Sequence, residues 1–386
     1  MTASHPALVD GPIYLDYNAT TPVDPRVVEA ALPYLTDYFG NPSSGHRYSA
    51  EPRAALAEAR AEVAHLIGAQ PDSVIITGSG SEADALAIQG SVLASDSTHM
   101  ISQVTEHPAV LGACETLSRQ HGIKTTYLPV DAYGRVAPDD LRKALTQPTG
   151  LVSIMYANNE TGVLQPIAEL AAIAHEHGAL LHTDAAQAVG KIPVDVAELD
   201  VDLVTVVGHK MYAPKGIGAL YVRPGVRLEP LVRGGGQEHG LRAGTENTAW
   251  AVAFGAAARI AGSELVDEGN RLRGLRDRLF QRLVDQLPGR VQLNGHLTQR
   301  LPNTLNVTIG GVRGDDLLAS CPQVAASTGS ACHTGTTEPS PVLLAMGCSA
   351  DRALGALRLT LGRWTSQADV DEAADHIAEV ARASGE

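Results

Sequence analysis

The sequence predicts an α/β protein with a mainly parallel sheet in a large domain and a smaller α+β domain toward the C-terminus. Between residue 51 and about residue 260, short apolar runs with the pattern of buried strands alternate with helical segments. Such repeats are typical of a parallel sheet that helices cover on both faces. The 386 residues, of which 44% are hydrophobic, suffice for one large core and a smaller one.

The elements of the large domain follow one another in a regular order. The first helix, AEPRAALAEARAEVAHLIGA, starts after Ser49 as the N-cap candidate and places Leu56, Val63 and Ile67 on one face. The strands are predicted at 73–77, 99–104, 124–128, 151–156, 179–184 and 203–207, with helices such as 82–90 and 167–177 between them. Ligands of such sheets bind beyond the carboxyl ends of the strands.

The pattern changes after about residue 260. A long charged helix at about 264–287 leads into short strands at 304–309 and 356–361. We therefore divide the chain into a large domain, residues 16–260, and a small domain formed by residues 1–15 and 261–386.

Charge and composition exclude several classes of function. The net charge of −14 argues against direct binding to nucleic acid or to an anionic membrane. No apolar run approaches the roughly 20 residues that cross a bilayer, and the N-terminus has no basic region before an apolar one. We expect a cytoplasmic protein. The four cysteines form no C-x-x-C pair, so we expect free thiols and no metal site, although Cys332 and His333 are adjacent.

Polar residues follow the ends of three predicted strands. Lys210 comes just beyond strand 203–207, Asp184 ends strand 179–184, and Gly78-Ser79-Gly80-Ser81 opens a helix after strand 73–77. A lysine can form a Schiff base with an aldehyde, and a carboxylate can keep a ring nitrogen protonated. Pyridoxal phosphate requires both groups, and its phosphate suits the backbone N–H groups at a helix start. The three strand ends together predict a pyridoxal phosphate site.

Each of these features alone has a simpler interpretation. A lysine after a strand is usually a solvated charge, an aspartate before a helix is usually an N-cap, and Gly-x-Gly is usually a turn. The segment GSGSEA also fits the G-x-G-x-x-A fingerprint of a dinucleotide site, but Glu106 is poorly placed for a ribose and NAD leaves Lys210 without a role. The trio, with Gln187 and His107 at further strand ends, favours pyridoxal phosphate.

One cysteine lies in a polar loop of the small domain. Cys332 is surrounded by Ser, Thr, Gly and Ala in VAASTGSACHTGTTEPSPVLL. The other three cysteines have a structural interpretation, since Cys114 lies in a helical segment, Cys321 ends an apolar helix and Cys348 follows Met-Gly near a helix start. The polar loop around Cys332, at about 324–340, can deliver a nucleophile to a cofactor. A cation or imidazole would raise the thiolate fraction. His107, His209 and His333 are all candidates for that role.

The motifs in their order resemble the class V aminotransferase family, specifically cysteine desulfurases of the NifS/IscS type and the related selenocysteine lyases. The matching segments are YLDYNATTP (14–22), GNPSS (40–44), TEH (105–107), ANNETG (157–162), HTDAAQAVGK (182–191), GHK (208–210), GGGQEHGLRAGTENT (234–248), TGSAC (328–332) and LRLTLGR (357–363). They cover essentially the whole chain. The resemblance implies the aspartate aminotransferase-like fold (fold type I) and pyridoxal 5'-phosphate as cofactor.

The resemblance also implies roles for individual residues. Lys210 is similar to the Schiff-base lysine, Asp184 to the partner of the ring nitrogen, and His107 to the residue stacked on the ring. The implied cofactor contacts further include Gln187 at the phenolic oxygen, Asn159 nearby, and Gly80, Ser81, His209 and Thr245 of the partner subunit at the phosphate. Arg358, helped by Asn41 and Asn159, is similar to the site of the substrate carboxylate, and Cys332 to the nucleophile that forms a persulfide.

Two departures from the desulfurase pattern concern the substrate. Val207 stands where many desulfurases have a serine, so one hydroxyl contact to phosphate is missing. Val207 and GTENT are closer to the selenocysteine lyase pattern. TGSACHTG resembles the NifS/IscS loop, which implies a long, mobile loop. We expect L-cysteine as substrate, with selenocysteine as the alternative.

The resemblance extends to partners. It implies a homodimer with shared active sites and a sulfur-acceptor protein, in a pathway such as Fe–S cluster assembly, tRNA thiolation or DNA modification. The sequence leaves the acceptor open. A non-catalytic sulfur-carrier scaffold is a further alternative, distinguished by the absence of turnover.

Overall fold

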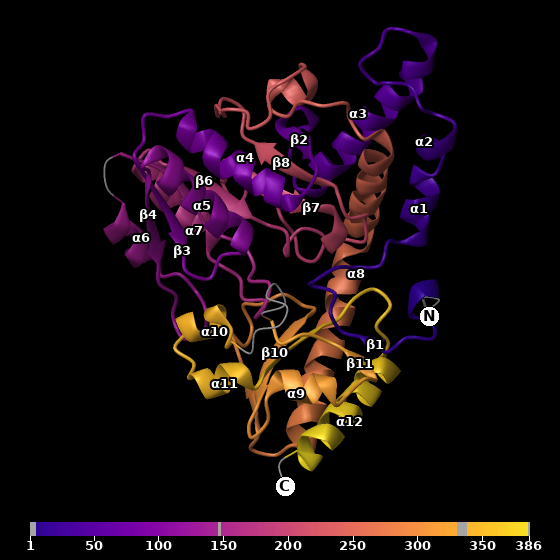
Figure 1. Cartoon of the computed structure of the whole chain (residues 1–386), viewed down its shortest axis with the longest axis vertical. Coiled ribbons are helices and arrows are strands. Elements are labelled where there is room, and N and C mark those ends of the chain that lie inside the picture. Colours follow the sequence, from indigo (N-terminus) through magenta and orange to yellow (C-terminus); the bar gives the residue numbers. More distant parts are fainter. Residues whose placement is uncertain (1–4, 146–147, 330–337, 385–386) are drawn as a thin grey trace.

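The computed structural model describes residues 5–145, 148–329 and 338–384. In Figure 1 a sheet with its helices forms the upper part of the molecule, and a smaller part with its own strands lies below it. The long helix α8 (Thr248–Gln286) runs from the upper part into the lower part. The predicted α/β class, with a mainly parallel sheet and a smaller α+β part, is confirmed.

The upper part is built on a seven-stranded sheet in the order β2-β8-β7-β6-β5-β3-β4. Its strands are β2 (Val74–Thr77), β3 (His99–Gln103), β4 (Lys124–Leu128), β5 (Thr149–Ser153), β6 (Leu180–Asp184), β7 (Leu203–Val207) and β8 (Gly218–Val222). Only β8 is antiparallel to its neighbours. The other six match the predicted strands. Strand β8 is an addition, because the Gly/Pro-rich turn before it favours a loop.

Helices pack against the sheet and around α8. Those within the described residues are α1 (Pro25–Ala31), α2 (Pro33–Thr36), α3 (Ala50–Leu66), α4 (Gly80–Leu93), α5 (Pro108–His121), α6 (Pro138–Ala144), α7 (Ile167–Glu176), α8, α9 (Gly314–Ala319), α10 (Pro341–Ala345), α11 (Ala350–Leu354) and α12 (Gln367–Ala383). Ser49 occupies the N-cap position of α3 as predicted, but its hydroxyl donates to the carbonyls of Ser44 and His46 and does not cap the helix.

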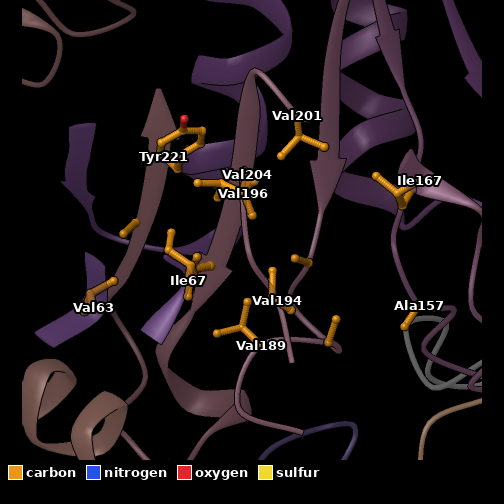
Figure 2. Close-up of a cluster of buried hydrophobic side chains, with 14 of the residues drawn as sticks. Val63, Ile67, Ala157, Ile167, Val189, Val194, Val196, Val201, Val204 and Tyr221 are labelled. Carbon is orange, nitrogen blue, oxygen red and sulfur yellow. The ribbon is translucent and has the colours of Figure 1, made fainter. Parts of the chain in front are cut away.

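Aliphatic side chains fill the core under the sheet. Figure 2 shows Val63 of α3, Ile67 at the C-cap of α3, Val204 of β7 and Tyr221 of β8 in one buried cluster, with Ile167 of α7 farther along the same core. Burial of each such side chain contributes roughly 1.5–3 kcal/mol to stability. The strands are therefore held rigidly, and so are the residues at their ends.

The lower part contains a second sheet. Strands β9 (Val291–Leu293), β10 (Thr304–Ile309) and β12 (Ala356–Thr360) form it in the order β12-β10-β9. The N-terminal strand β1 (Ile13–Tyr14) pairs with β11 (Val324–Ala325). The boundary that we place at residue 260 falls inside α8, so one continuous helix joins the two parts.

By length and composition α8 could cross a membrane. In the structure, however, 56% of its most apolar window is buried within the protein. This pattern is that of a core helix, because the apolar side chains are covered by the protein itself.

Candidate active site

The carboxyl ends of the parallel strands border a cavity of about 300 Å³. Because parallel strands end at the same edge of a sheet, the residues that follow β2, β3, β6 and β7 meet there. The lining residues are Asn18, Ala19, Ser79, Gly80, Ser81, Asp84, His107, Met155, Ala157, Asn159, Asp184, Ala186, Gln187, Val207, His209, Lys210, Gly329 and Arg358. Most of the predicted site residues are therefore brought together.

Lys210 reaches the cavity from a 3-10 turn, Gly208–Lys210, that directly follows β7. Its Nζ donates to the backbone carbonyls of Asn18 and Ala19, at 2.7 Å each. Both acceptors belong to the N-terminal segment, which crosses the strand ends at this point. The position of this lysine after a buried strand thus points its amine into the cavity, where it can react with a carbonyl.

Asp184, the last residue of β6, lines the cavity and is 6% exposed. Its Oδ1 accepts a hydrogen bond from the Ala186 N–H at 2.9 Å. Burial raises its pKa, while that N–H group, His107 and Lys210 act in the opposite direction. A carboxylate held in this way can accept a hydrogen bond from a protonated ring nitrogen.

His107 occupies the N-cap of α5 and faces the same cavity. Burial lowers the pKa of its imidazole, and Lys210 adds to this effect, although Asp184 opposes it. Its Nδ1 accepts from the Ala109 N–H at 3.2 Å, so the neutral ring carries its proton on Nε2. The ring is therefore fixed in tautomer and orientation.

One end of the cavity is suited to a phosphate. Helix α4 begins there at Gly80, with Ser81 next to it, and a helix start offers the free N–H groups of its first turn to an anion. A Cβ at position 80 would overlap the side chain of Val207. His209 also lines this end, and burial lowers its pKa to about 4, so its imidazole is neutral at pH 7.

Arg358 of β12 also lines the cavity and is 3% exposed. Its Nη2 donates to Asp16 Oδ1 at 2.8 Å and its Nη1 to the carbonyl of Asn159 at 3.4 Å. Its buried Nε has no hydrogen-bond partner among the described residues. A buried guanidinium with a spare donor is suited to a carboxylate ligand.

Three predicted site residues are not in this set. Asn41 is exposed in the loop after α2, where its Oδ1 accepts from the Ser43 N–H, so the chain does not bring it to its own Arg358. Thr245 is exposed in the loop before α8, outside the cavity of its own chain. Cys332 and the neighbouring His333 lie outside the described residues.

Comparison with known proteins identifies the family. The aminotransferase class-V family matches residues 13–373. The chain belongs to this family. It is 46% identical to a cysteine desulfurase of Nostoc sp., with 95% of this chain and 92% of that protein covered. It is 45% identical to the cysteine desulfurase IscS of Methanosarcina thermophila, with 95% and 91% covered.

Solved structures give the same assignment. A NifS-like protein superposes with a TM-score of 0.89 at 34% identity and covers 96% of this chain and 99% of its own. The structure described as SspA in complex with cysteine has a TM-score of 0.81 at 34% identity, with 92% and 99% covered. The predicted resemblance to class V aminotransferases of the cysteine desulfurase type is confirmed.

Class-V aminotransferases of the desulfurase type are pyridoxal phosphate enzymes, and the cavity of this member fits that cofactor. It combines a lysine amine, a buried carboxyl, and a helix start whose Gly80 leaves no room for a Cβ. Lys210 would hold the aldehyde carbon, Asp184 the ring nitrogen, and Gly80 with Ser81 the phosphate. A dinucleotide site would need an acidic residue to bind the ribose. Glu106 does not serve this purpose, because it is buried and accepts from the Met155 N–H.

Several residues of this class-V site were missed by the motif analysis. Asn18 touches Lys210, Gln187 and Asn159, and Asp16 pairs with Arg358. Both lie in YLDYNATTP (14–22), a segment that contributes to the family resemblance but predicts no role for either residue. A run of small polar residues before a proline gives no sign of which side chain turns inward.

A buried polar cluster lies beneath Asp184. Asp84 of α4 is 2% exposed, and its Oδ1 has no hydrogen-bond partner among the described residues. Burial raises its pKa well above the usual value, and Asp184 raises it further. Neighbouring His182 has its pKa lowered to about 3 by burial. Burial therefore favours the uncharged form of both Asp84 and His182.

Proposed function

We propose that this enzyme converts L-cysteine into L-alanine and transfers the sulfur, as a persulfide on Cys332, to an acceptor protein. The observation that supports it most is the convergence of Lys210, Asp184 and Arg358 on one cavity. The relatives named cysteine desulfurase, at 45–47% identity, support the same activity.

When bound, pyridoxal phosphate supplies the electron sink that stabilises a carbanion at the Cα of the substrate. Arg358 binds the substrate carboxylate, and its spare Nε–H and nearby Asn159 keep the amino acid in one orientation. The free amine of Lys210 would remove the Cα proton as a general base. Asp184 holds the proton of the ring nitrogen in place throughout.

Cys332 then takes the sulfur atom. Its thiolate attacks the substrate sulfur, so that an S–S bond forms while the Cβ–S bond breaks. The electron pair of the broken bond stays with the substrate carbon, which is reduced and takes up a proton, and the sulfur is oxidised to the persulfide level. L-cysteine and the Cys332 thiol thus yield L-alanine and a Cys332 persulfide. An acceptor thiol removes the outer sulfur.

We further propose a homodimer in which Thr245 completes the phosphate site of the partner subunit. The exposure of Thr245 and its distance in sequence from the strand-end residues support this arrangement. The cytoplasmic location stays a prediction from the sequence.

The experiment that tests the function compares wild type with Cys332→Ser, and with Cys348→Ser as a matched control. We expect Cys332→Ser to bind cysteine but to release alanine more than about 100-fold more slowly, because the nucleophile is lost. Cys348 is a partly exposed thiol away from the cavity, and its variant should keep normal turnover.

The same assay with selenocysteine separates the alternative substrate. A selenol leaves more readily than a thiol, so a lyase would act on selenocysteine without Cys332. Normal cysteine turnover by Cys332→Ser would remove this residue from the mechanism. Wild type that accepts only selenocysteine would overturn the desulfurase proposal.

A further inference from the structure

A second lysine lies directly behind the active site. Lys191 ends the turns that follow β6, and its Nζ donates to Gln187 Oε1 at 2.6 Å and to Asn18 Oδ1 at 3.1 Å. Gln187 and Asn18 line the cavity, whereas Lys191 does not. Neither the cofactor contacts nor the proposed steps described above use this residue.

The contact decides which way the amide of Gln187 faces. A lysine ammonium has only donors, so the amide oxygen must point toward it and the NH2 group away from it. On that other side, Gln187 Nε2 donates to the backbone carbonyl of Asn18 at 3.0 Å. The NH2 group is thereby placed next to Lys210, whose Nζ donates to the same carbonyl at 2.7 Å.

The side chain of Asn18 is oriented in the same manner. Its Oδ1 accepts from Lys191 and, at 3.1 Å, from Asn303 Nδ2. Its Nδ2 therefore turns to Thr304 Oγ1 at 2.9 Å and to the carbonyl of Asn159 at 3.2 Å. Every polar atom of this buried side chain is used, so Asn18 is held in a single conformation.

The contacts do not depend on the charge of Lys191. Burial lowers the pKa of its ammonium well below the usual value, and the cations of Lys210 and Arg358 lower it further. A neutral amine still carries two hydrogens, one for each of its two acceptors. Lys191 can thus keep both hydrogen bonds in either protonation state.

We propose that Lys191 is a positioning residue of the active site, which fixes Gln187 as a hydrogen-bond donor toward the ring oxygen of the cofactor. An unrestrained amide presents either its oxygen or its NH2 group to the cavity, and the oxygen would repel a phenolate. The inference rests on the proposed function, since it requires pyridoxal phosphate in the cavity.

A double-mutant cycle tests this inference through cofactor binding. Pyridoxal phosphate is titrated into cofactor-free wild type, Lys191→Met, Gln187→Ala and the double variant, and the Kd and the absorption maximum of the bound cofactor are recorded. We expect Lys191→Met to raise the Kd about tenfold, as for one lost hydrogen bond, and to shift the maximum. In the Gln187→Ala background the same substitution should change the Kd less than about twofold.

Further variants control for folding and for loss of charge. Lys191→Arg keeps a donor and should retain most of the wild-type Kd, whereas Lys143→Met removes a lysine that is 75% exposed on α6 and should change nothing. If the Lys191→Met variant does not fold, the Lys191→Gln variant is used in its place. The amide of a glutamine can both donate and accept, so it does not dictate which end of the Gln187 amide faces it.

Two results would overturn the inference: Lys191 variants that bind and absorb like wild type, or an effect of Lys191→Met that is undiminished in the Gln187→Ala background. The proposed function fails differently, since wild type itself would then not bind pyridoxal phosphate.

Discussion

At the residue scale, burial decides which carboxyl of the site carries charge. Asp84 and Asp184 are both buried. Burial raises the pKa of each, and Asp184 further raises the pKa of Asp84. Asp184 has three groups that stabilise its ionised form, the Ala186 N–H, His107 and Lys210, whereas among the described residues Asp84 has only a hydrogen bond from Thr205. Two adjacent buried carboxylates cannot both ionise at low cost, so the proton resides on Asp84.

This difference predicts how Asp84→Asn changes stability with pH. The pKa of Asp84 in the folded state lies well above its unfolded value, so its contribution to stability is fully present below the unfolded pKa of about 4 and is lost as pH rises. Asparagine does not titrate. The free energy of unfolding of the cofactor-free variant, relative to that of wild type, should therefore rise by about 1.4 kcal/mol per pH unit above pH 4. This rise continues as long as Asp84 stays protonated in folded wild type.

Urea unfolding of both proteins between pH 4 and pH 8 measures this difference. Asp96→Asn, which changes an exposed carboxyl just beyond α4, is the matched control and should run parallel to wild type. A pH-independent difference between Asp84→Asn and wild type would show that Asp84 ionises normally in the folded state.

At the scale of elements, the phosphate end depends on the contact between α4 and β7. Gly80 starts the helix and Val207 ends the strand, and the space that a Cβ of residue 80 needs is filled by the Val207 side chain. The backbone of α4 can thus approach the strand end closely, which places its free N–H groups around the anion site.

We predict that Gly80→Ala destabilises the cofactor-free protein by roughly 1–3 kcal/mol. The short, branched side chain of Val207 cannot turn its methyl groups away from the added Cβ. Val207→Ala removes the obstructing methyl groups, so the double variant should recover most of the loss. Thermal unfolding of the four proteins gives the coupling. Fully additive effects would mean that the two residues do not press against each other.

A buried ion pair anchors the loop that carries Thr245. Glu238 accepts from Arg60 of α3 through both carboxylate oxygens at 2.6 Å, and from the Ile76 N–H at 2.7 Å. Its side chain is 2% exposed, and its φ of 48° lies in the left-handed region. This pair therefore fixes the loop to α3 and β2 at Glu238, a few residues before Thr245.

Glu238→Gln should destabilise the protein by about 3 kcal/mol, because it leaves the Arg60 guanidinium buried without its counter-charge. Glu115→Gln, which breaks the exposed pair with Arg119, serves as the control and should cost less than about 1 kcal/mol. Chemical denaturation measures both. Equal effects of the two substitutions would contradict the anchoring role of Glu238.

At the scale of the whole molecule, two parts meet over the cavity and one apolar surface stays uncovered. Asn18 joins the parts, since it binds Lys191 and Lys210 on one side and Asn303 and Thr304 on the other.

Along α1, α2 and the following loop, exposed apolar side chains are Val28 (50%), Leu32 (54%), Leu35 (58%), Phe39 (75%) and Tyr48 (66%). These helices lie at the right-hand edge of Figure 1.

In the homodimer proposed above, this surface would face the second copy of the chain, since the Thr245 of each chain lies outside its own cavity. Leu35→Asp should shift sedimentation from dimer to monomer and lower turnover together with it. Val266→Asp, at an apolar position 69% exposed on α8, should leave both unchanged. A fully active monomer of wild type at assay concentration would contradict the shared site.

The sequence by itself determined the α/β class, six of the strands of the main sheet and the strand-end residues Lys210, Asp184 and His107. Periodicity marks buried strands, and parallel strands always end at one edge, so residues at those ends must meet. The tertiary structure alone decided the roles of Asn18, Asp84 and Lys191, whose partners are supplied by segments far away in the chain. It also decided the charge of each buried group, because a pKa follows from burial and from neighbours that only the fold brings together.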